Sequence, residues 1–367
     1  MKIAIMGFRG IPARYGGFET FVEELAPRLV RKGHQVTVYG RSNIIKNYYT
    51  GNYYKGVRLV ILPTISHKYL DTVVHTFLSV LHCCFYNFDV VFILNAANSI
   101  FAFIPHLFGK KVVLSVDGIE RMRKKWNWIG KLYYCLGEYL ATKFPDEIVS
   151  DAKVIRQYYL KRYNKDSSMI PYGANTERVR SCEILRKFDL EPNDYLLYVS
   201  RLEPENNAHI AIKAFKRAKI NKKLVIVGDV PYASKYKREI QRLAAGDEKI
   251  IFTGFVFGKG YKELQSNAFC YIQATEVGGT HPALVEAMGF GNCVIVNGTP
   301  ENIEVVGDAG IIYRKNDVDD LKEKIQYVIS NANVIKVYKE KALERIKQNY
   351  SWDTVTDRYE KLFKSNH

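Results

Sequence analysis

The chain has 367 residues, enough for about two domains, and 47% of them are apolar and 25% charged. These values exclude a small disulfide-stapled protein and an intrinsically disordered one. The net charge of +16 is uneven, because residues 1–174 carry 24 basic and 12 acidic side chains and the remaining residues carry a net charge of only +4. The asymmetry predicts that the first half faces something anionic: a nucleic acid, a phospholipid surface or a phosphorylated substrate.

The first half alternates short apolar runs with longer segments, which predicts parallel strands joined by crossover helices. The expected strands are Ile3–Met6, Val36–Tyr39, Leu59–Leu62, Val90–Leu94, Val112–Val116 and Glu147–Val149. Apolar residues recur every three or four positions between Gly17 and Gly33, so a helix is expected there. Two uncharged stretches, 72–88 and 90–109, contain too many polar residues for membrane spans. They predict a buried helix followed by a buried strand.

The alternation restarts after residues 171–174, which predicts a second domain of the same class. Its expected strands are Tyr195–Val199, Leu224–Val227, Ile250–Phe252, Cys270–Gln273 and Cys293–Val296. The charged segment 176–193 is the expected hinge, and the chain from Val334 onward is expected to be helical with an interruption near Tyr350. The predicted parts are therefore residues 1–174, 175–349 and a final helix over 350–367.

A glycine-rich loop containing Gly16 and Gly17 lies between the first strand and the first helix. Glycines let backbone N–H groups approach an anion, and the helix N-terminus adds partial positive charge. The loop is thus a candidate phosphate cradle, while a plain strand-to-helix turn explains the glycines equally well. A dinucleotide site would need GxGxxG spacing and an acidic residue after the second strand, where this chain has Gly40 and Arg41.

The second domain opens with Arg201 just after a strand, followed by Glu205, Asn206 and Asn207. An arginine at the carboxyl end of such a strand can hold a phosphate through two hydrogen bonds. Arg201 is therefore a candidate diphosphate ligand; the alternative is an ordinary surface ion pair.

A third group of residues follows the strand that ends at Gln273. Two glycines, Gly278 and Gly279, precede Thr280, His281 and Pro282. Thr280 is expected to cap the helix that follows, so a second phosphate site is predicted at its N-terminus. Glu286 lies one turn into this helix, where it can accept hydrogen bonds from ribose hydroxyls or serve as a surface carboxylate.

The remaining signals are weaker. Asp117 follows a strand and is either a polar site group or a turn former. The segment 121–128 interleaves basic and aromatic residues, which suits nucleic-acid stacking, a membrane headgroup layer or a solvated loop. No residues have metal-ligand spacing, and the six cysteines show no CxxC pair, so buried cytosolic thiols are expected. The first residues do not resemble an export signal.

Taken together, these motifs resemble a family 4 glycosyltransferase of the GT-B architecture, over essentially the whole chain. The matching residues are Gly16-Gly17-x-Glu19, the run from Leu25 to Val36, Ser200-Arg201-Leu202, and Pro282-x-x-x-Glu286 through Gly291. More narrowly, the runs 9–19, 117–120, 204–207 and 278–282 resemble a rhamnosyltransferase-like subgroup that builds bacterial surface polysaccharides. The resemblance implies two Rossmann-like doubly wound parallel-sheet domains facing a cleft, with a final helix that crosses back to the first domain.

Three positions depart from the family pattern. The family has a lysine five residues after the arginine, where this chain has Asn206. The first of the family's paired glutamates is expected at 278, whereas this chain has Gly278 there and Glu276 two residues earlier. Asp117 stands near the place of a first-domain histidine.

The resemblance implies retaining transfer of a sugar, with dTDP-L-rhamnose or a UDP-sugar as donor and a lipid-linked saccharide as acceptor. It implies catalytic roles for Asp117, Arg201 and Glu276, and donor binding by residues Gly16, Gly17, Arg201, Asn206, Gly278, Gly279, Thr280, His281 and Glu286. No metal, cofactor or nucleic acid is expected. The protein is expected in the cytoplasm, at an anionic membrane surface on the inner face of the cytoplasmic membrane.

Two other classes stay open from the sequence. A non-hydrolysing sugar-nucleotide epimerase would share the two-domain architecture and change its sugar without an acceptor. A non-catalytic basic protein that binds RNA or lipid would depend steeply on salt and ignore nucleotide sugars.

Overall fold

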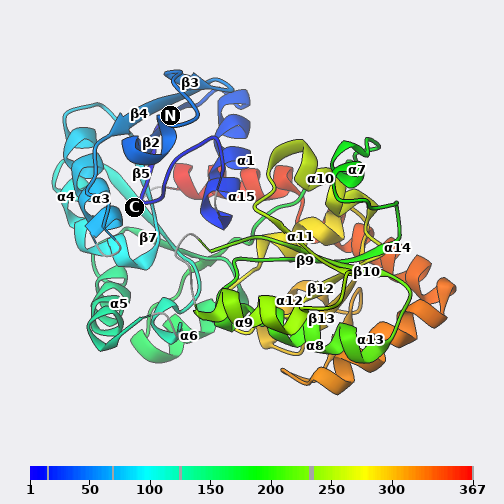
Figure 1. The fold of residues 1–367 in the computed structure, drawn as a ribbon. Coiled ribbons are helices and arrows are strands. Elements are labelled where there is room, and N and C mark those ends of the chain that lie inside the picture. The colour runs from blue at the N-terminus through cyan, green and yellow to red at the C-terminus, as the bar shows by residue number, and fades with distance from the viewer. Residues whose placement is uncertain (15, 68–69, 124–125, 231–234, 366–367) are drawn as a thin grey trace. The chain divides into compact units, whose positions relative to one another are not determined.

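The structure is a computed structural model that describes residues 1–367 except 15, 68–69, 124–125, 231–234 and 366–367. The chain divides into two compact units (Figure 1). Unit 1 comprises Met1–Tyr172 and Trp352–His367, and unit 2 comprises Gly173–Ser351. Each unit is built on a mostly parallel sheet, which confirms the predicted α/β class.

Unit 1 has an eight-stranded sheet in the order β3-β4-β2-β1-β5-β6-β7-β8, in which β3 and β4 are antiparallel and the other neighbours parallel. The strands are β1 (Lys2–Met6), β2 (Gln35–Arg41), β3 (Tyr53–Tyr54), β4 (Val57–Leu62), β5 (Val90–Leu94), β6 (Lys111–Val116), β7 (Glu147–Ser150) and β8 (Ser168–Met169). The helices are α1 (Gly17–Arg31), α2 (Ser42–Ile45), α3 (Leu70–Cys84), α4 (Phe103–Leu107), α5 (Trp128–Ala141), α6 (Lys153–Tyr163) and α15 (Trp352–Lys364), with 3₁₀ helices η1 (Ala96–Phe101) and η2 (Glu120–Met122).

The alternation of side chains along β1 assigns the helices of unit 1 to two faces. Ile3 and Ile5 point into a core shared with α1 and α15. Ala4 and Met6 point into the opposite core, which contains residues of α3 and α6. Because strand side chains alternate sides, a strand that is apolar throughout requires a helix layer on each face.

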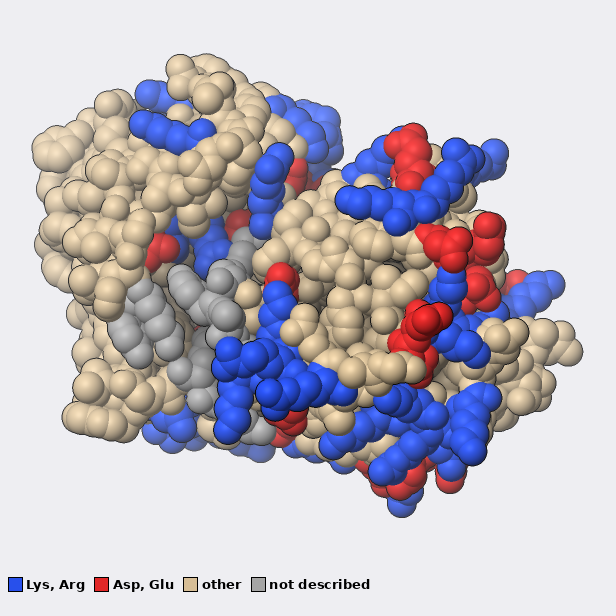
Figure 2. All heavy atoms as spheres, in the orientation of Figure 1, with Lys and Arg blue, Asp and Glu red and all other residues tan. Residues whose placement is uncertain are grey.

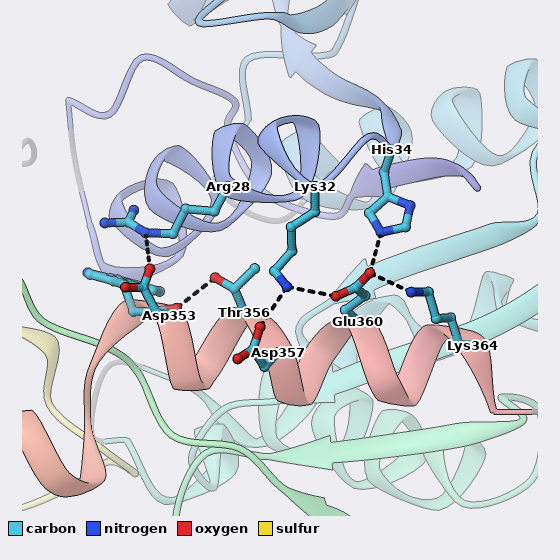
Figure 3. A network of polar contacts seen from close by, with 9 residues as sticks. Arg28, Lys32, His34, Asp353, Thr356, Asp357, Glu360 and Lys364 are labelled. Carbon is cyan, nitrogen blue, oxygen red and sulfur yellow. Dashed lines mark hydrogen bonds and ion pairs between the residues drawn. The ribbon is translucent and has the colours of Figure 1, made fainter.

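The last helix, α15, packs on α1 within unit 1 (Figure 3). Lys32 Nζ lies 2.7 Å from Asp357 and 2.9 Å from Glu360, whose other oxygen is 3.0 Å from His34 Nε2. Beneath these contacts, Tyr359 and Phe363 are buried against the sheet. The implied return of the final helix to the first domain is confirmed.

Unit 2 has a six-stranded parallel sheet in the order β11-β10-β9-β12-β13-β14. The strands are β9 (Tyr195–Val199), β10 (Lys223–Val227), β11 (Ile250–Gly254), β12 (Cys270–Gln273), β13 (Cys293–Asn297) and β14 (Ile311–Tyr313). The helices are α7 (Glu183–Lys187), α8 (Ala208–Ala218), α9 (Lys235–Ala244), α10 (Gly258–Asn267), α11 (Pro282–Gly289), α12 (Pro300–Val306), α13 (Val318–Ser330) and α14 (Ala332–Asn349), with 3₁₀ helix η3 (Pro204–Asn206).

The same alternation builds unit 2. Leu196 and Tyr198 of β9 face a core with α8, α9 and α13, whereas Tyr195 and Leu197 face a core with α10, α11 and α14. The carboxyl ends of parallel strands therefore meet at one sheet edge, which is where ligands of such sheets bind.

The strands predicted from the sequence are all present, and the short β3, β8 and β14 were not predicted. The helix predicted over 72–88 is present as α3, but the prediction that it is buried is wrong for one side of the helix, where Phe77 and Leu81 are exposed. Within the described residues, no helix has the length and apolar character needed to cross a membrane.

Candidate active site

The loop after β9 carries Arg201 at the carboxyl edge of the unit 2 sheet. A Cβ on Gly228, which has φ +128°, would lie 1.9 Å from the Ser200 carbonyl oxygen, so only glycine permits this close approach of the two chain segments. Within the turn, Asn206 Nδ2 donates a 2.7 Å hydrogen bond to the Arg201 carbonyl. The turn is thus fixed from both sides, which positions Arg201 at the sheet edge.

The Arg201 side chain is 28% exposed, with its guanidinium 3.6 Å from Glu203. A partly exposed guanidinium at a sheet edge presents the planar pair of N–H donors that suits an incoming anion. Asn206 itself is buried, and its amide is used to hold the Arg201 backbone. The structure therefore gives Asn206 a role in shaping the loop; direct contact with a donor remains a prediction.

The loop after β12 lies next to the Arg201 loop, because β9 and β12 are paired. The backbone N–H of Glu276 donates a 2.9 Å hydrogen bond to the carbonyl of Glu205 and joins the two loops directly. Gly278 leaves room for the His281 ring, since a Cβ there would lie 2.5 Å from His281 Cε1. The predicted site residues around Arg201 and around 276–281 are thus brought together.

Helix α11 begins at Pro282, and its N-cap is His281, whose side chain makes no capping hydrogen bond. The prediction that Thr280 caps the helix is therefore wrong: the proline takes the first helical position and moves the cap one residue along. Thr280 and Gly279 are buried in the loop, and the N–H groups of the first turn lie at the same sheet edge as Arg201. A helix N-terminus and a guanidinium on adjacent loops make an anion site suited to a diphosphate.

Glu286, one turn into α11, accepts a 2.6 Å hydrogen bond from the hydroxyl of Tyr261 on α10. Burial, and next the charge of Glu286, raise the pKa of Tyr261 well above its ordinary value, so the phenol keeps its proton and donates it. Gln265 Nε2 in turn donates to the Tyr261 hydroxyl at 3.0 Å. The half-buried carboxylate is held in one orientation by groups that the sequence reasoning missed.

Four asparagines tie the loops of this edge together. Asn207 Nδ2 and Asn297 Nδ2 both donate to the Ala274 carbonyl, at 3.1 and 3.0 Å, and both reach Asn316 Oδ1, at 2.9 and 2.8 Å. Asn302 Nδ2 donates to the Thr275 carbonyl at 3.2 Å. These amides satisfy buried carbonyls at the start of the loop that carries Glu276 and Gly278. They come from different elements and leave no common pattern in the sequence.

Glu205 belongs to the sequence group that follows Arg201, where it had no predicted role of its own. It is fully buried, and within the described residues neither carboxylate oxygen has a hydrogen-bond partner. Burying a carboxylate without hydrogen-bond partners lowers the stability of the folded protein. Groups that destabilise the fold in this way are commonly found at binding sites.

In unit 1, Gly16 is the N-cap of α1 and Gly17 its first residue. The loop is held from behind by the buried Glu19, whose Oε1 accepts a 3.2 Å hydrogen bond from the Arg9 backbone N–H. Close packing of Gly10 on Gly40 shapes the same loop, since a Cβ on Gly10 would lie 2.8 Å from the Gly40 Cα. The helix N-terminus is thereby presented at the carboxyl edge of the sheet of unit 1.

Asp117 follows β6 at the same edge of the unit 1 sheet and is half-buried. Burial, and next the charge of Asp117, raise the pKa of the neighbouring Tyr172 well above its ordinary value. The segment that follows is anchored by Arg121, whose Nη2 lies 2.8 Å from the Tyr158 hydroxyl, and by the buried Glu138, which accepts a 2.7 Å hydrogen bond from that hydroxyl. Asp117 thus lies at a strand end, just before this anchored segment.

Two family models match the chain. Residues 183–349 match the model described as "Glycosyl transferases group 1", and residues 1–175 match "Domain of unknown function (DUF1972)". The second half of this chain therefore resembles a glycosyl transferases group 1 domain. The loops that carry Arg201 and Glu276, and Glu286 of α11, all lie within the residues of that match.

Similar proteins agree with this assignment. An uncharacterized glycosyltransferase of Methanocaldococcus jannaschii is 28% identical over 72% of this chain and 70% of its own length. The lipopolysaccharide 1,2-N-acetylglucosaminetransferase of Salmonella typhimurium is 26% identical over 67% of this chain and 70% of its own length. Among solved structures, Anabaena HepE in complex with UDP superposes with a TM-score of 0.78 at 15% identity, covering 100% of both chains. These findings support a glycosyltransferase with the GT-B fold.

Proposed function

We propose that this glycosyltransferase moves a sugar from a nucleotide diphosphate donor to a saccharide acceptor in the synthesis of a surface polysaccharide, with L-rhamnose from dTDP-L-rhamnose as the best assignment of the donor. The observation that carries the proposal is the joining of the Arg201 loop to the 274–281 loop by the Glu276–Glu205 backbone hydrogen bond of 2.9 Å. A guanidinium and a helix N-terminus then lie on adjacent loops, with a carboxylate on the same helix.

Names of similar proteins support the substrate class. Solved HepE complexes contain UDP, UDP with glucose, or UDP-glucose. The Salmonella relative is named for lipopolysaccharide, and an Escherichia coli protein that is 23% identical over 47% of this chain is named O-antigen chain mannosyltransferase B. These names support a nucleotide sugar as the donor and a saccharide as the acceptor of this chain.

In the proposed reaction, the bond between the sugar C1 and the diphosphate oxygen breaks and a bond from C1 to the acceptor oxygen forms on the same face. The acceptor proton passes to the departing phosphate oxygen, so no separate protein base is needed. Arg201 and the first N–H groups of α11 stabilise the charge that grows on the leaving group. Glu286 accepts hydrogen bonds from the ribose, and Glu276 and Asp117 contact the reacting sugars.

The proposed acceptor is a lipid-linked saccharide, reached from the cytoplasmic side of a membrane. The charge of +12 on residues 1–174 supports a protein that works beside an anionic surface. Gly16 and Gly17, at the N-terminus of α1, are proposed to bind an anionic group of a substrate.

A thermal-shift panel tests the proposal. UDP, dTDP, UDP-glucose and dTDP-L-rhamnose should raise the melting temperature selectively, whereas AMP and inorganic phosphate should not, because a ligand stabilises the state that binds it. Glu286→Gln should weaken the binding free energy of the donor by about 1 to 3 kcal/mol, because a neutral amide replaces a charged acceptor. The thermal shift of this variant should be correspondingly smaller. No response to any nucleotide would refute the proposal. Conversion of the free nucleotide sugar without an acceptor would identify an epimerase instead.

A further inference from the structure

Most of the exposed large apolar side chains among the described residues belong to unit 1, and they cluster on three helices. In α5, the exposed large apolar residues are Trp128, Ile129, Leu132, Leu136 and Tyr139. Trp128 is 74% exposed and Leu132 62% exposed. Their spacing of three or four residues places them on one stripe, so the helix is apolar on its outward side as well as its inward side. The outward side of a helix that faces water is ordinarily polar.

The stripe on α5 continues onto its neighbours. Phe103 and Leu107 of α4 and Phe108 just after it are exposed, and the Phe103 ring lies 5.3 Å from the ring of Phe144, which follows α5. On α3, the exposed Phe77 ring lies 5.6 Å from Phe101 in η1. Figure 1 shows α3, α4 and α5 along the same side of unit 1, and in Figure 2 this side is largely tan. The exposed apolar side chains therefore extend over several neighbouring elements.

The exposed charges on α4 and α5 and just after α5 have one sign. The carboxylate of Glu138 on α5 is 4% exposed, and Asp71 of α3 is paired with Arg41 at 2.6 Å. Lys131 and Lys143 are exposed, and Lys143 Nζ lies 5.6 Å from the centre of the Tyr139 ring. Lysines beside an apolar stripe extend their charged ends toward an interface while their stems stay in apolar contact. The surface is thus apolar with a cationic margin.

We propose that this surface, called the α4–α5 face and formed by Phe103, Leu107, Phe108, Trp128, Leu132, Leu136 and Tyr139, inserts into the interface of an anionic lipid bilayer. A bilayer offers acyl chains to the apolar stripe and acidic headgroups to Lys131 and Lys143. Trp128 and Tyr139, at the two ends of the stripe, are residue types that favour the headgroup level. The inference rests on the proposed function in one respect, since the lipid-linked acceptor lies in the same bilayer.

The charges also argue against a second copy of this chain as the occupant. A twofold interface places the same patch on both partners, so the lysines of one copy would meet those of the other. With the exposed part of α4 and α5 free of acidic side chains among the described residues, nothing on the face would neutralise them. Apolar insertion also differs from attachment by net charge alone, because salt screens charges and leaves apolar burial intact.

Co-flotation with phosphatidylcholine vesicles containing phosphatidylglycerol, at low and high salt, tests the proposal. The wild-type chain should float with these vesicles and keep part of its binding at high salt. The variant Trp128→Ser, Leu132→Ser, Leu136→Ser should lose at least about tenfold in partitioning at both salt levels, because each replaced side chain no longer buries apolar area. The variant Lys131→Gln, Lys143→Gln should lose only the preference for phosphatidylglycerol.

A matched control is Tyr327→Ser, Val337→Ser, which removes two exposed apolar side chains of unit 2 and should leave flotation unchanged. All replaced side chains are exposed, so each variant should keep the wild-type melting temperature. Equal flotation of the serine triple variant and the wild type would overturn the proposal. A wild-type dimer in light scattering that the triple variant dissociates, without vesicle binding, would also overturn it and show a second copy on the face. The UDP thermal shift separates this result from the proposed function, because a failure of the face leaves that shift intact.

Discussion

The hydroxyl of Tyr261 donates a 2.6 Å hydrogen bond to Oε2 of Glu286, and this bond links the interior of unit 2 to its candidate donor site. The link extends inward, because Gln265 Nε2 donates to Tyr261 and Asn292 Nδ2 donates 2.8 Å to the Gln265 carbonyl. A carboxylate fixed in this way would bind the proposed ribose at little cost in conformational freedom.

Replacing Tyr261 by phenylalanine should weaken donor binding more than turnover. A phenyl ring has no hydroxyl with which to orient the Glu286 carboxylate. The KM for the nucleotide sugar should therefore rise about tenfold while kcat changes much less, because an orienting hydrogen bond to a charged group is worth about 1.5 to 3 kcal/mol. Steady-state kinetics with the preferred donor measures both parameters.

Tyr195→Phe is the matched control for this variant. Tyr195 is also buried in unit 2, but its hydroxyl donates to the Leu264 backbone carbonyl at 2.6 Å and touches no predicted site residue. Both variants should lose stability, and only Tyr261→Phe should raise the KM. A rise of equal size in both would remove Tyr261 from the site.

The asparagine cluster predicts a coupled loss of stability and donor binding. In Asn297→Ala, the side chain can no longer donate to the Ala274 carbonyl or to Asn316 Oδ1. The free energy of unfolding of unit 2 should fall by about 2 to 4 kcal/mol, because these buried groups are left unpaired. The 274–281 loop should then bind nucleotide more weakly. Urea unfolding followed by circular dichroism measures the stability, and the UDP thermal shift measures the binding.

The three tryptophans provide an internal control, because Trp126, Trp128 and Trp352 all lie in unit 1. In Asn297→Ala, the unfolding transition followed by tryptophan fluorescence should be the same as in the wild type, because unit 1 is unchanged. A shifted fluorescence transition together with unchanged nucleotide binding would contradict a local role for Asn297.

The sequence predicts the strands and the loops that follow them, but it makes no prediction of the strand order in either sheet. Arg201 and the residues 276–286 follow apolar strands, and the carboxyl ends of parallel strands necessarily share an edge. Tyr261, by contrast, lies in the middle of α10 and reaches Glu286 only through packing between helices. Such tertiary contacts leave no local pattern. The predicted cap at Thr280 is wrong because Pro282 suits the first helical position and sets the boundary.

Outward-facing apolar residues are harder to predict. The absence of charge in 72–88 predicts burial, yet Phe77 and Leu81 of α3 are exposed. Hydrophobicity shows that a side chain avoids water; it does not tell whether the protein's own core or a separate apolar phase covers it.

His75 predicts how the stability of unit 1 depends on pH. Its ring is fully buried on α3, and burial, with the nearby Arg41 charge, lowers its pKa from 6.5 to about 4, an effect that Asp71 partly opposes. The folded state therefore binds fewer protons than the unfolded state between these values. The stability that unit 1 gains from the neutral His75 ring is fully present above pH 6.5, and it is lost as the pH falls toward about 4.

His75→Phe should remove this part of the pH dependence, which amounts to about 3 kcal/mol for a shift of this size. Urea unfolding followed by tryptophan fluorescence at intervals between pH 7 and pH 4 reports unit 1 selectively. A wild-type stability that stays level across this window would show that the ring is charged or solvated in the folded state.

Arg201 gives the sharpest prediction for catalysis. The charge on the departing diphosphate grows in the transition state, so the guanidinium contact should strengthen there and act on turnover. Arg201→Ala should lower kcat by about two to three decades, as loss of one such contact does, with little change in acceptor KM. Arg201→Lys should recover only part of the rate, because an ammonium cannot donate the planar pair of hydrogen bonds.

The control for charge alone is Arg217→Ala, which removes a half-exposed arginine of α8 that pairs with Asp319 at 2.9 Å. Sugar transfer by this variant should match the wild type, and all variants should first be shown to melt at the same temperature. Because Asn206 stands where a second cation is found in the resembling family, no neighbouring lysine at that position can replace the lost guanidinium. Near-wild-type turnover of Arg201→Ala would mean that other groups hold the diphosphate, and the donor would have to be reassigned to the N-terminus of α1 with Gly16 and Gly17.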